Sequence, residues 1–308
     1  MIAVDKTERK KIISELQSKA REVFDLKKKH RQRRPIVIEF SGSPKSGKTT
    51  CINSLELFLK RNGSKVQIVQ ERASICPVAD KKSPMFNIWT SCMSITQMIA
   101  SLEQKVATCD VLILDRGVFD AFCWFDWLHS KKAISHYNKT AIENFLSIDL
   151  LINRIDIVFA FTVNPDISIE REYANLLTDM PGTIMSKNTL AEYLRSVRRV
   201  IEQKNHYFHK IFEIDTSDKE PDNVGKEVTE MTLETLRAML MENIGYLEPA
   251  SETIEKLTQR RFMSFPVDKS DIELNDISFG LRNDIENNDC YILRFSAPKT
   301  KADSGGCP

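Results

Sequence analysis

Apolar and polar residues follow two different rhythms along this 308-residue chain. Short apolar runs rich in branched and aromatic side chains occur within residues 36–40, 65–70, 111–115, 156–165 and 208–215. Runs of this length and composition are typical of buried strands. The segments between them carry apolar residues every three or four positions, which predicts helices. Strands that alternate with helices predict an α/β fold, a five-stranded parallel sheet with helices on both faces.

A charged helix precedes the first strand. Residues 6–29 have apolar residues at helical spacing, and a basic run follows at residues 27–34. Residues 1–34 hold 12 Lys and Arg against 5 Asp and Glu, whereas the whole chain has a net charge of only +1. The run either binds nucleic acid or another polyanion, or is a solvated helix end followed by a linker. The second interpretation is favoured, because no aromatic residues are interleaved to stack on bases.

The pattern changes again from about residue 248. A basic and aromatic stretch at residues 260–266 and a strand-like stretch at residues 290–295 indicate a small appended subdomain, and residues 298–308 are expected to be disordered. We therefore divide the chain into an N-terminal helix (1–34), a central domain (35–247) and a C-terminal appendage (248–308). The two outer segments are the candidate contacts for a nucleic acid or protein partner.

Composition narrows the protein class. Apolar residues make up 42% of the chain and charged residues 28%, as in ordinary globular proteins. No apolar run approaches the ~20 residues that span a bilayer, and the N-terminus lacks the apolar core of a signal peptide. The seven cysteines form no C-x-x-C pair, which indicates reduced thiols rather than disulfides or a structural zinc site. We expect a cytoplasmic protein without a membrane contact. An aromatic helix at residues 119–128 is either core or the face of a homodimer.

The most specific motif follows the first strand. Residues 42–49, GSPKSGKT, fit G-x-x-x-x-G-K-[ST] at every fixed position, and an amphipathic helix comes next. Gly42 and Gly47 allow backbone angles that a Cβ forbids, so that N–H groups can turn inward around an anion. The motif assigns Lys48 to the β- and γ-phosphates of a nucleotide and Thr49 to Mg²⁺. The predicted nucleotide-binding residues are Gly42, Ser43, Pro44, Lys45, Ser46, Gly47, Lys48, Thr49 and Thr50.

Charged residues follow two other strands. Glu71 and Arg72 follow the second strand, and Asp115 and Arg116 follow the third. Open α/β sheets bind their ligands at this edge. A carboxylate at the end of a buried strand, downstream of a phosphate loop, predicts a metal-binding Asp115, with Arg116 able to reach a phosphate. The alternative is that Asp115 caps the next helix. Asp120, one turn into that helix, is a weaker candidate for facing substrate.

Two helical segments supply further candidates. Phe86, Trp89, Met93 and Gln97 share one helix face, which is either core or the wall of a substrate pocket. Residues 167–203 are charged and helical and carry four arginines, Arg171, Arg195, Arg198 and Arg199. Such a segment can fold over a nucleotide and bring arginines to a transferring phosphoryl group, or it can be a surface hairpin with solvated arginines.

Taken together, residues 35–242 resemble the P-loop nucleoside and nucleotide kinases, with thymidylate kinase and the deoxyribonucleoside kinases as the nearest comparison. The resemblance implies the strand order 2-3-1-4-5, with ATP and Mg²⁺ as cofactors. It implies that Lys48 and Thr49 hold the phosphates and the metal. The Asp115–Arg116 pair would bridge metal and phosphates. The resemblance also implies that residues 215–217 run under the adenine.

The resemblance further implies that Glu71 accepts the proton of a substrate hydroxyl and that Arg171, Arg195 and Arg198 belong to a lid. Two departures stand against a full match. Arg72 occupies the position where the family has a proline, and no arginine lies between Arg72 and Arg116, where thymidylate kinase binds the phosphate of its substrate. A substrate that presents a hydroxyl therefore fits better, although Arg72 or Lys81 could replace the missing arginine.

Two functions follow from these residues. The first is phosphoryl transfer from ATP to a nucleoside, nucleotide or related small molecule, in which Lys48, Glu71, Asp115, Arg116, Arg171, Arg195 and Arg198 act in catalysis. The second is an ATP-dependent switch or adaptor that acts on a macromolecular partner through residues 1–34 and 248–308. A kinase needs the carboxylate of Glu71, whereas a switch does not.

Overall fold

A computed structural model describes residues 6–29, 34–104, 108–174, 182, 184–245, 278–280 and 294–296. Residues 1–246 form one compact unit and residues 247–308 form another. In the second unit, β6 (Ser278–Gly280) pairs antiparallel with β7 (Arg294–Ser296), which places Phe279 opposite Phe295. The rest of the predicted appendage lies outside the described residues. None of the helices that the structure describes is long and apolar enough to cross a membrane.

The first unit is built on the predicted sheet. The strands are β1 (Ile36–Gly42), β2 (Val66–Val69), β3 (Val111–Asp115), β4 (Ile157–Thr162) and β5 (Ile211–Asp215), all parallel, in the order β2-β3-β1-β4-β5. The predicted fold and strand order are confirmed. The register pairs Phe40 with Asp115 and Gly42 with Phe161. The carboxyl ends of the neighbouring strands β3, β1 and β4 therefore lie side by side.

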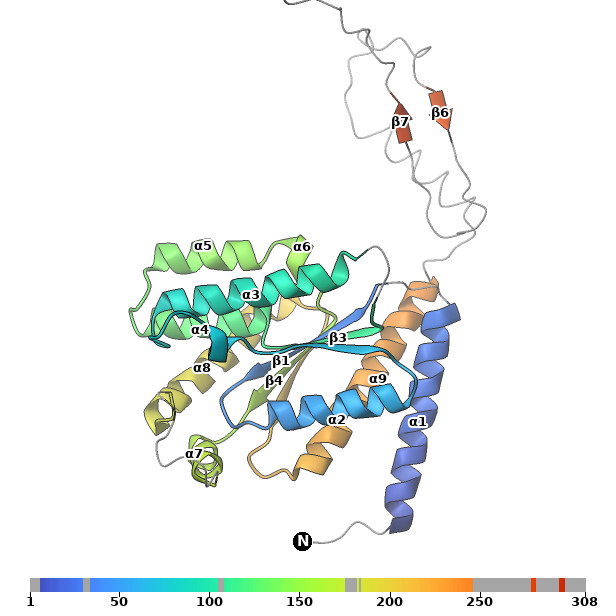
Figure 1. Cartoon of the computed structure of the whole chain (residues 1–308), viewed down its shortest axis with the longest axis horizontal. Coiled ribbons are helices and arrows are strands. Elements are labelled where there is room, and N and C mark those ends of the chain that lie inside the picture. Colours follow the sequence, from blue (N-terminus) through green and yellow to red (C-terminus); the bar gives the residue numbers. More distant parts are fainter. Residues whose placement is uncertain are drawn as a thin grey trace, which may run out of the picture. The chain divides into compact units, whose positions relative to one another are not determined.

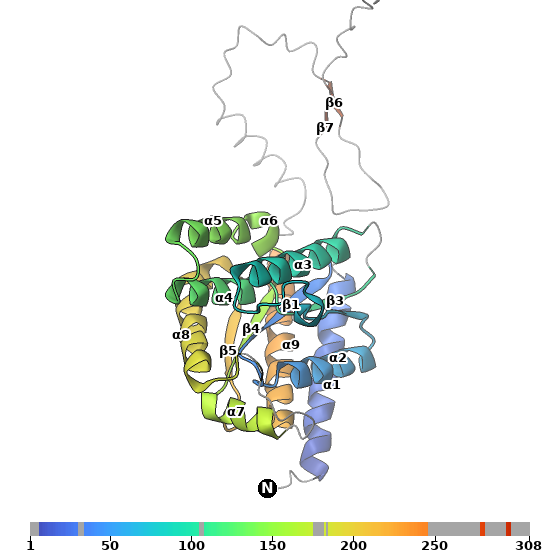
Figure 2. The ribbon, with the colours of Figure 1, turned by 60° about the vertical axis from the view of Figure 1, so that its left-hand side comes forward.

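Alternate residues of the strands point to opposite faces, and each face has its own apolar core. The helices α1 (Lys6–Lys29), α2 (Lys48–Arg61) and α9 (Pro221–Gly245) cover one face. The helices α3 (Pro84–Leu102), α4 (Val118–Ser130) and α8 (Lys187–Lys204) cover the other (Figures 1 and 2). The remaining helices are α5 (His136–Leu146), α6 (Asp149–Ile152), α7 (Pro165–Tyr173) and the short turns η1 (Ala73–Ile75) and η2 (Asn205–Tyr207).

The aromatic helix α4 is core. Every residue from Val118 to Leu128 is buried, and the helix packs against α3, α5 and α8. The most exposed of these eleven residues is Trp124, which is only 9% exposed. Between the two interpretations of this helix, core packing is therefore the correct one, and α4 does not offer a dimer face.

The N-terminal helix belongs to the same core. Leu16, Ala20, Val23 and Phe24 are buried on α1 and join the cluster beneath α2 and α9. The prediction that the basic run after this helix is solvated is wrong at Lys27. This residue is 6% exposed, and its ammonium group donates to the carbonyl of Asp110 at 2.9 Å. Lys27 therefore links the end of α1 to the residue that precedes β3. Residues 30–33 lie outside the described residues.

Arg34 makes a second contact of this kind. Its guanidinium pairs with Asp156 at 2.5 Å and donates to the carbonyl of Arg154 at 2.9 Å. Asp156 in turn accepts from the Val37 N–H at 2.8 Å. The carboxylate thus joins the entry to β1 with the entry to β4. The contacts at the amino ends of these strands are therefore structural. They lie opposite the carboxyl ends, where the phosphate loop is found.

We predict that Phe24→Ala lowers the free energy of unfolding by about 3–5 kcal/mol, because it removes a buried ring from the core. Ile13→Ala on the same helix, where the side chain is 44% exposed, should change it by less than about 0.5 kcal/mol. Urea unfolding of both variants measures the difference. Equal midpoints would show that α1 does not pack as described.

Candidate functional site

The loop between β1 and α2 has the backbone that its glycines predict. Gly42 has φ +133°, and a Cβ there would lie 2.0 Å from the carbonyl oxygen of Phe161. Gly47 has φ +87° and Lys45 has φ +57°. Gly47 offers no side-chain cap, and the first turn of α2 carries no acidic residue. The N–H groups at the start of this helix are thus presented to an anion without a competing carboxylate.

Neighbouring elements hold the loop in this shape. Ser46 Oγ donates to the Ser43 carbonyl at 2.8 Å, Ser168 Oγ donates to Pro44 at 2.8 Å, and Thr216 Oγ1 donates to Ser46 at 3.0 Å. The first contact is within the loop, and the other two come from α7 and from the residue that follows β5. The loop is therefore fixed by chain segments more than 100 residues away.

Lys48 lies under the loop. Its side chain is 7% exposed, and Nζ donates to the carbonyls of Gly42 at 3.0 Å and Ser43 at 2.8 Å. Burial, followed by the charge of Arg116, lowers the pKa of Lys48 to about 8. Placed here, the ammonium group offers a positive charge to an anion held by the loop.

Asp115 has the features of a metal ligand. Its Oδ1 atom is buried and has no hydrogen-bond partner among the described residues, and burial raises its pKa. A buried carboxylate oxygen without a partner is costly unless a cation or a donor meets it. Asp115 and the exposed hydroxyl of Thr49 line the same cavity. This pair of oxygen ligands fits Mg²⁺, which prefers one or two protein ligands beside water and phosphate.

Arg116 is held by carboxylates on two sides. Its Nε lies 2.8 Å from Glu71 Oε1, and its Nη1 lies 2.9 Å from Asp120 Oδ1 and 3.2 Å from the Gly42 carbonyl. Its backbone has φ +70°, which few residues other than glycine adopt. The structure thus brings the predicted residues Glu71, Asp115 and Arg116 together beside the loop.

Asp120 lies buried at the contact of three elements and also lines the cavity that holds Glu71 and Asp115. The residue is 4% exposed, and Oδ1 also accepts from Ser41 Oγ at 2.8 Å and from Tyr193 Oη at 3.2 Å. Tyr193 comes from α8 and lies against Trp124, with ring centroids 4.2 Å apart. Asp120 therefore links β1, α4 and α8. In the sequence, Asp120 stood out as a carboxylate inside a predicted helix that is otherwise rich in aromatic residues.

Glu39 is a buried carboxylate next to the site that the sequence did not single out. It is completely buried in β1, and its carboxylate accepts from the N–H groups of Gly117, Phe119 and Asp120 at 2.9, 3.1 and 2.8 Å. It therefore caps the start of α4 from within the sheet. A charged residue between Ile38 and Phe40 was the available signal, and the partners could not be read from the sequence.

Two cavities flank the phosphate loop. Cavity A, of about 540 Å³, extends over Glu71, Asp115 and Arg116 toward α3 and α4. Cavity B, of about 750 Å³, extends over Arg171 and the loop that follows β5. Both are lined by Lys45, Lys48 and Thr49. The two cavities therefore share the residues that carry the positive charge of the loop.

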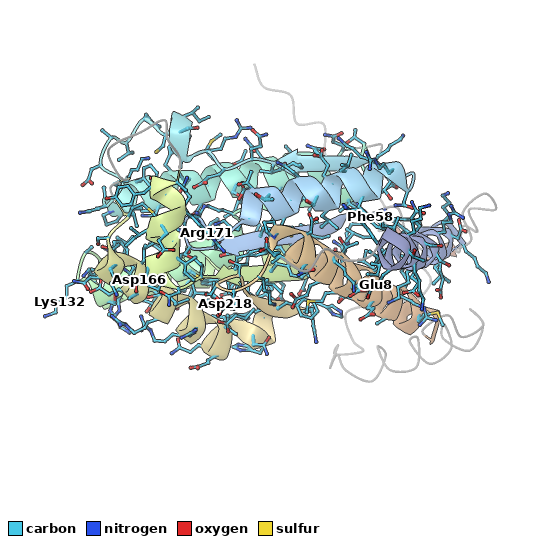
Figure 3. The ribbon with its side chains drawn as sticks, turned by 90° about the horizontal axis from the view of Figure 1, so that it is seen from below. Glu8, Phe58, Lys132, Asp166, Arg171 and Asp218 are labelled. Atoms are coloured by element: carbon cyan, nitrogen blue, oxygen red, sulfur yellow. The ribbon has the colours of Figure 1, made fainter. Side chains whose placement is uncertain are left out.

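The structure separates the predicted arginines. Arg171 lines cavity B and donates to the carbonyls of Thr216 at 2.7 Å and Lys45 at 3.2 Å. Figure 3 shows Arg171 on α7 and Asp218, which also lines cavity B, on the same side of the domain. Arg195 and Arg198 are exposed on α8 and line neither cavity, and Arg198 lies 3.5 Å from Glu213. Arg199 pairs with Asp126 at 2.6 Å.

The predicted face of α3 is only partly at the site. Phe86 lines cavity A, but Trp89 and Met93 do not. Gln97, with its amide oxygen turned toward Arg72, accepts from Nε and Nη2 at 2.8 Å each. The other α3 residues that line the cavity are Asn87, Thr90, Ser91 and Ser94. They are polar, so the apolar spacing of the helix did not indicate them.

No family model matches this chain, and no curated protein matches it. Solved structures do resemble it. One is deoxyadenosine kinase from M. mycoides with bound dATP, at a TM-score of 0.49 and 14% identity over 64% of this chain and 99% of that chain. Another is thymidylate kinase from Candida albicans, at 0.45 and 16% over 66% and 94%. The likeness is one of fold. Both proteins are kinases of the expected class, and at these identities and TM-scores the likeness carries no conclusion about activity.

We predict that stability depends on the protonation of Glu39. Burial raises the pKa of this carboxyl from 4.5 to about 7, although three N–H donors favour its charged form. The folded protein then holds the proton more tightly than the unfolded chain. The free energy of unfolding should fall as pH rises from about 4.5 to above 7, by up to about 3 kcal/mol.

Urea unfolding of wild type and Glu39→Gln at pH 5 and pH 8 tests this. Glutamine cannot ionise, and its NH₂ group leaves one of the three N–H groups unpaired. The wild type should therefore exceed the variant in stability at pH 5, by a margin that shrinks at pH 8. Glu15→Gln, at an exposed position of α1, is the control. A margin that widens toward pH 8 would show that the N–H donors outweigh burial.

Proposed function

We propose that the protein transfers a phosphoryl group from ATP, with Mg²⁺, to a small-molecule acceptor, with nucleosides, nucleotides and related molecules as the expected class. The observation that carries this proposal is the pair of cavities that meet at Lys48 and Thr49. A protein that only binds or hydrolyses a nucleotide needs one cavity beside its phosphate loop. Two cavities that share the loop's lysine allow a donor and an acceptor to approach the same phosphoryl group.

The donor would lie in cavity B. The phosphate loop and the start of α2 would receive its phosphates, with Arg171 and residues 216–218 beside the nucleoside. Thr49 and Asp115 would hold Mg²⁺, which supplies charge neutralisation for the β- and γ-oxygens when bound. Lys48 places its ammonium group at the junction of the two cavities, where charge develops during transfer.

The acceptor would lie in cavity A. Glu71, held by Arg116, is 41% exposed in its side chain and can orient or deprotonate an acceptor hydroxyl. Arg116, fixed by Glu71 and Asp120, presents its remaining N–H groups toward the transferred group. Arg195 and Arg198 have no place in this arrangement, because they line neither cavity.

A switch or adaptor remains the second candidate, because residues 247–308 form a unit of their own that a small-molecule kinase does not need. In that function ATP binding would control contact with a protein or nucleic acid. Glu71 separates the two candidates, since a switch needs no acceptor base.

We predict that Lys48→Ala lowers ADP release from Mg·ATP by about 10³-fold, because the charge at the junction of the cavities is lost. Purified protein is assayed with a panel of nucleosides, nucleoside monophosphates and RNA. Lys60→Ala, at the exposed end of the same helix, should match the wild type. Equal turnover of Lys48→Ala and wild type would end the proposed mechanism.

We predict that Glu71→Gln binds ATP as tightly as wild type but loses at least about 10²-fold in acceptor-dependent ADP release, the range of a general base. Calorimetry measures the binding and the coupled assay measures the release. Glu103→Gln, on the surface at the end of α3, is the control. Full turnover of Glu71→Gln would favour the switch. ATP binding without stimulation of ADP release by any small acceptor would favour it as well.

A further inference from the structure

The backbone of Arg116 is held in an uncommon conformation from several sides. Its φ of +70° is a left-handed value, which residues other than glycine keep only where the surrounding structure imposes it. The Arg116 N–H donates to the Phe40 carbonyl at 2.9 Å, and the Arg116 carbonyl accepts from Ser94 Oγ at 2.8 Å. The next N–H, that of Gly117, donates to Glu39 Oε1 at 2.9 Å. Residues of β1 and α3 therefore fix the backbone on both sides of the Arg116 side chain.

Glu39 and Gly117 approach each other closely. A Cβ on Gly117 would lie 2.7 Å from both Cδ and Oε2 of Glu39, so a residue with a side chain would push the carboxylate away. Glu39 is completely buried, and it also accepts from the N–H groups of Phe119 and Asp120. The carboxylate thus binds the segment that directly follows Arg116 at three points.

A helix cap alone does not require this arrangement. A cap is usually supplied by a Ser, Thr, Asp or Asn just before the helix, but α4 has Gly117 at that position. The acceptor comes instead from within a buried strand, where a carboxylate is costly to desolvate. A cap on β1 adds what a local cap cannot, because it fixes the start of α4 relative to the strand that leads into the phosphate loop.

The strand β1 connects Glu39 to the site. It ends three residues later at Gly42, whose carbonyl accepts from Lys48 Nζ at 3.0 Å and from Arg116 Nη1 at 3.2 Å. Arg116 Nε also lies 2.8 Å from Glu71 Oε1. The place of the guanidinium between the loop and Glu71 therefore depends on how the backbone of residue 116 is held against β1.

We propose that Glu39 is a positioning residue, whose carboxylate holds the backbone of Arg116 and Gly117 so that the guanidinium stays aligned with the transferred phosphoryl group. This inference rests on the proposed function and adds a residue to its machinery. Glu39 lines neither cavity, so it touches no substrate and acts through Arg116. Displacement of an aligned group by about 1 Å can cost about 10²-fold in rate, which makes such support necessary.

The first test is Glu39→Gln. Glutamine keeps the shape of the side chain, but its NH₂ group meets at least one of the three N–H donors and displaces the segment. With Mg·ATP and the nucleoside or nucleotide that stimulates the wild type, kcat should fall at least about tenfold, whereas the KM for ATP should stay within about twofold. Calorimetry with ATP counts the folded molecules, and kcat is expressed per bound ATP.

Glu143→Gln is the matched control for this test. Its carboxylate is also partly buried and binds Lys139 and Lys204, but it lies on α5 and lines neither cavity. Its kcat per bound ATP should equal that of the wild type. The control separates loss of a buried carboxylate in general from loss of the one that holds Arg116.

The second test asks whether Glu39 acts through the guanidinium. Arg116→Lys keeps a cation beside Asp120 but removes the planar group that reaches Asp120 and Glu71 together. Glu39→Gln should cost at least about tenfold in kcat in the wild-type background and less than about threefold in the Arg116→Lys background. A purely structural role of Glu39 would give the same loss in both.

The outcomes separate the two proposals. An unchanged kcat per bound ATP in Glu39→Gln, or an equal loss in both backgrounds, would overturn the positioning role and leave phosphoryl transfer standing. If Glu39→Gln does not fold, Ser94→Ala replaces it in both tests, because it removes the donor to the Arg116 carbonyl. Its expected loss is at least about threefold, confined to the background with Arg116, and the same two results would count against the role. The absence of any Lys48-dependent stimulation by any acceptor would overturn both proposals.

Discussion

The ion pair between Arg116 and Asp120 is the interaction on which the site depends. Asp120 is buried and the side chain of Arg116 is 15% exposed, and Arg116 Nη1 lies 2.9 Å from Asp120 Oδ1. Transfer of two charges from water into a protein interior costs several kcal/mol each, and close pairing with further hydrogen bonds offsets this cost. Here Ser41 and Tyr193 complete the shell of Asp120. Loss of Arg116 would leave the buried charge of Asp120 without this cation, whereas loss of Asp120 would leave Arg116 with Glu71 alone.

This pair also determines the geometry around it. Arg116 adopts a left-handed backbone conformation, and its side chain reaches the carbonyl of Gly42 in the phosphate loop. Asp120 reaches back to β1 and across to α8. Glu39 adds a second link between β1 and α4 by capping the helix that carries Asp120. The loop, the Asp–Arg pair and the two helices are therefore held as one assembly, which is what a site that aligns two substrates requires.

The distribution of charge explains how one edge of the sheet can serve two cavities. Lys48 and Thr49 stand between the cavities, carboxylates and Arg116 lie on one side, and Arg171 lies on the other. The parallel arrangement makes this possible, because the carboxyl ends of all five strands open at the same edge. The opposite edge is occupied by structural pairs such as Arg34 with Asp156 and Lys27 with Asp110. The candidate site and the anchoring contacts thus lie at opposite ends of the strands.

The sequence by itself determined the parts of this protein whose signal is local. Short apolar runs predicted the five strands, helical spacing predicted the helices between them, and the fixed spacing of Gly42, Gly47, Lys48 and Thr49 predicted the phosphate loop. Parallel strands end at a common edge, so Glu71 and Asp115 could also be expected there. Each of these rests on residues close in the chain or on a general rule of sheet topology.

Only the tertiary structure decided which charged residues reach the site. The N–H groups that bind Glu39, and the hydroxyls of Ser41 and Tyr193 that bind Asp120, come from residues more than 70 positions away, and the burial of both carboxylates depends on how β1, α4 and α8 pack. Arg171 faces cavity B while Arg195 and Arg198 do not, because the rotation of α7 and α8 against the sheet decides which side of each helix is turned inward. The existence of two cavities has the same origin. A sequence pattern records the spacing along one element, but a site is made by the packing of several.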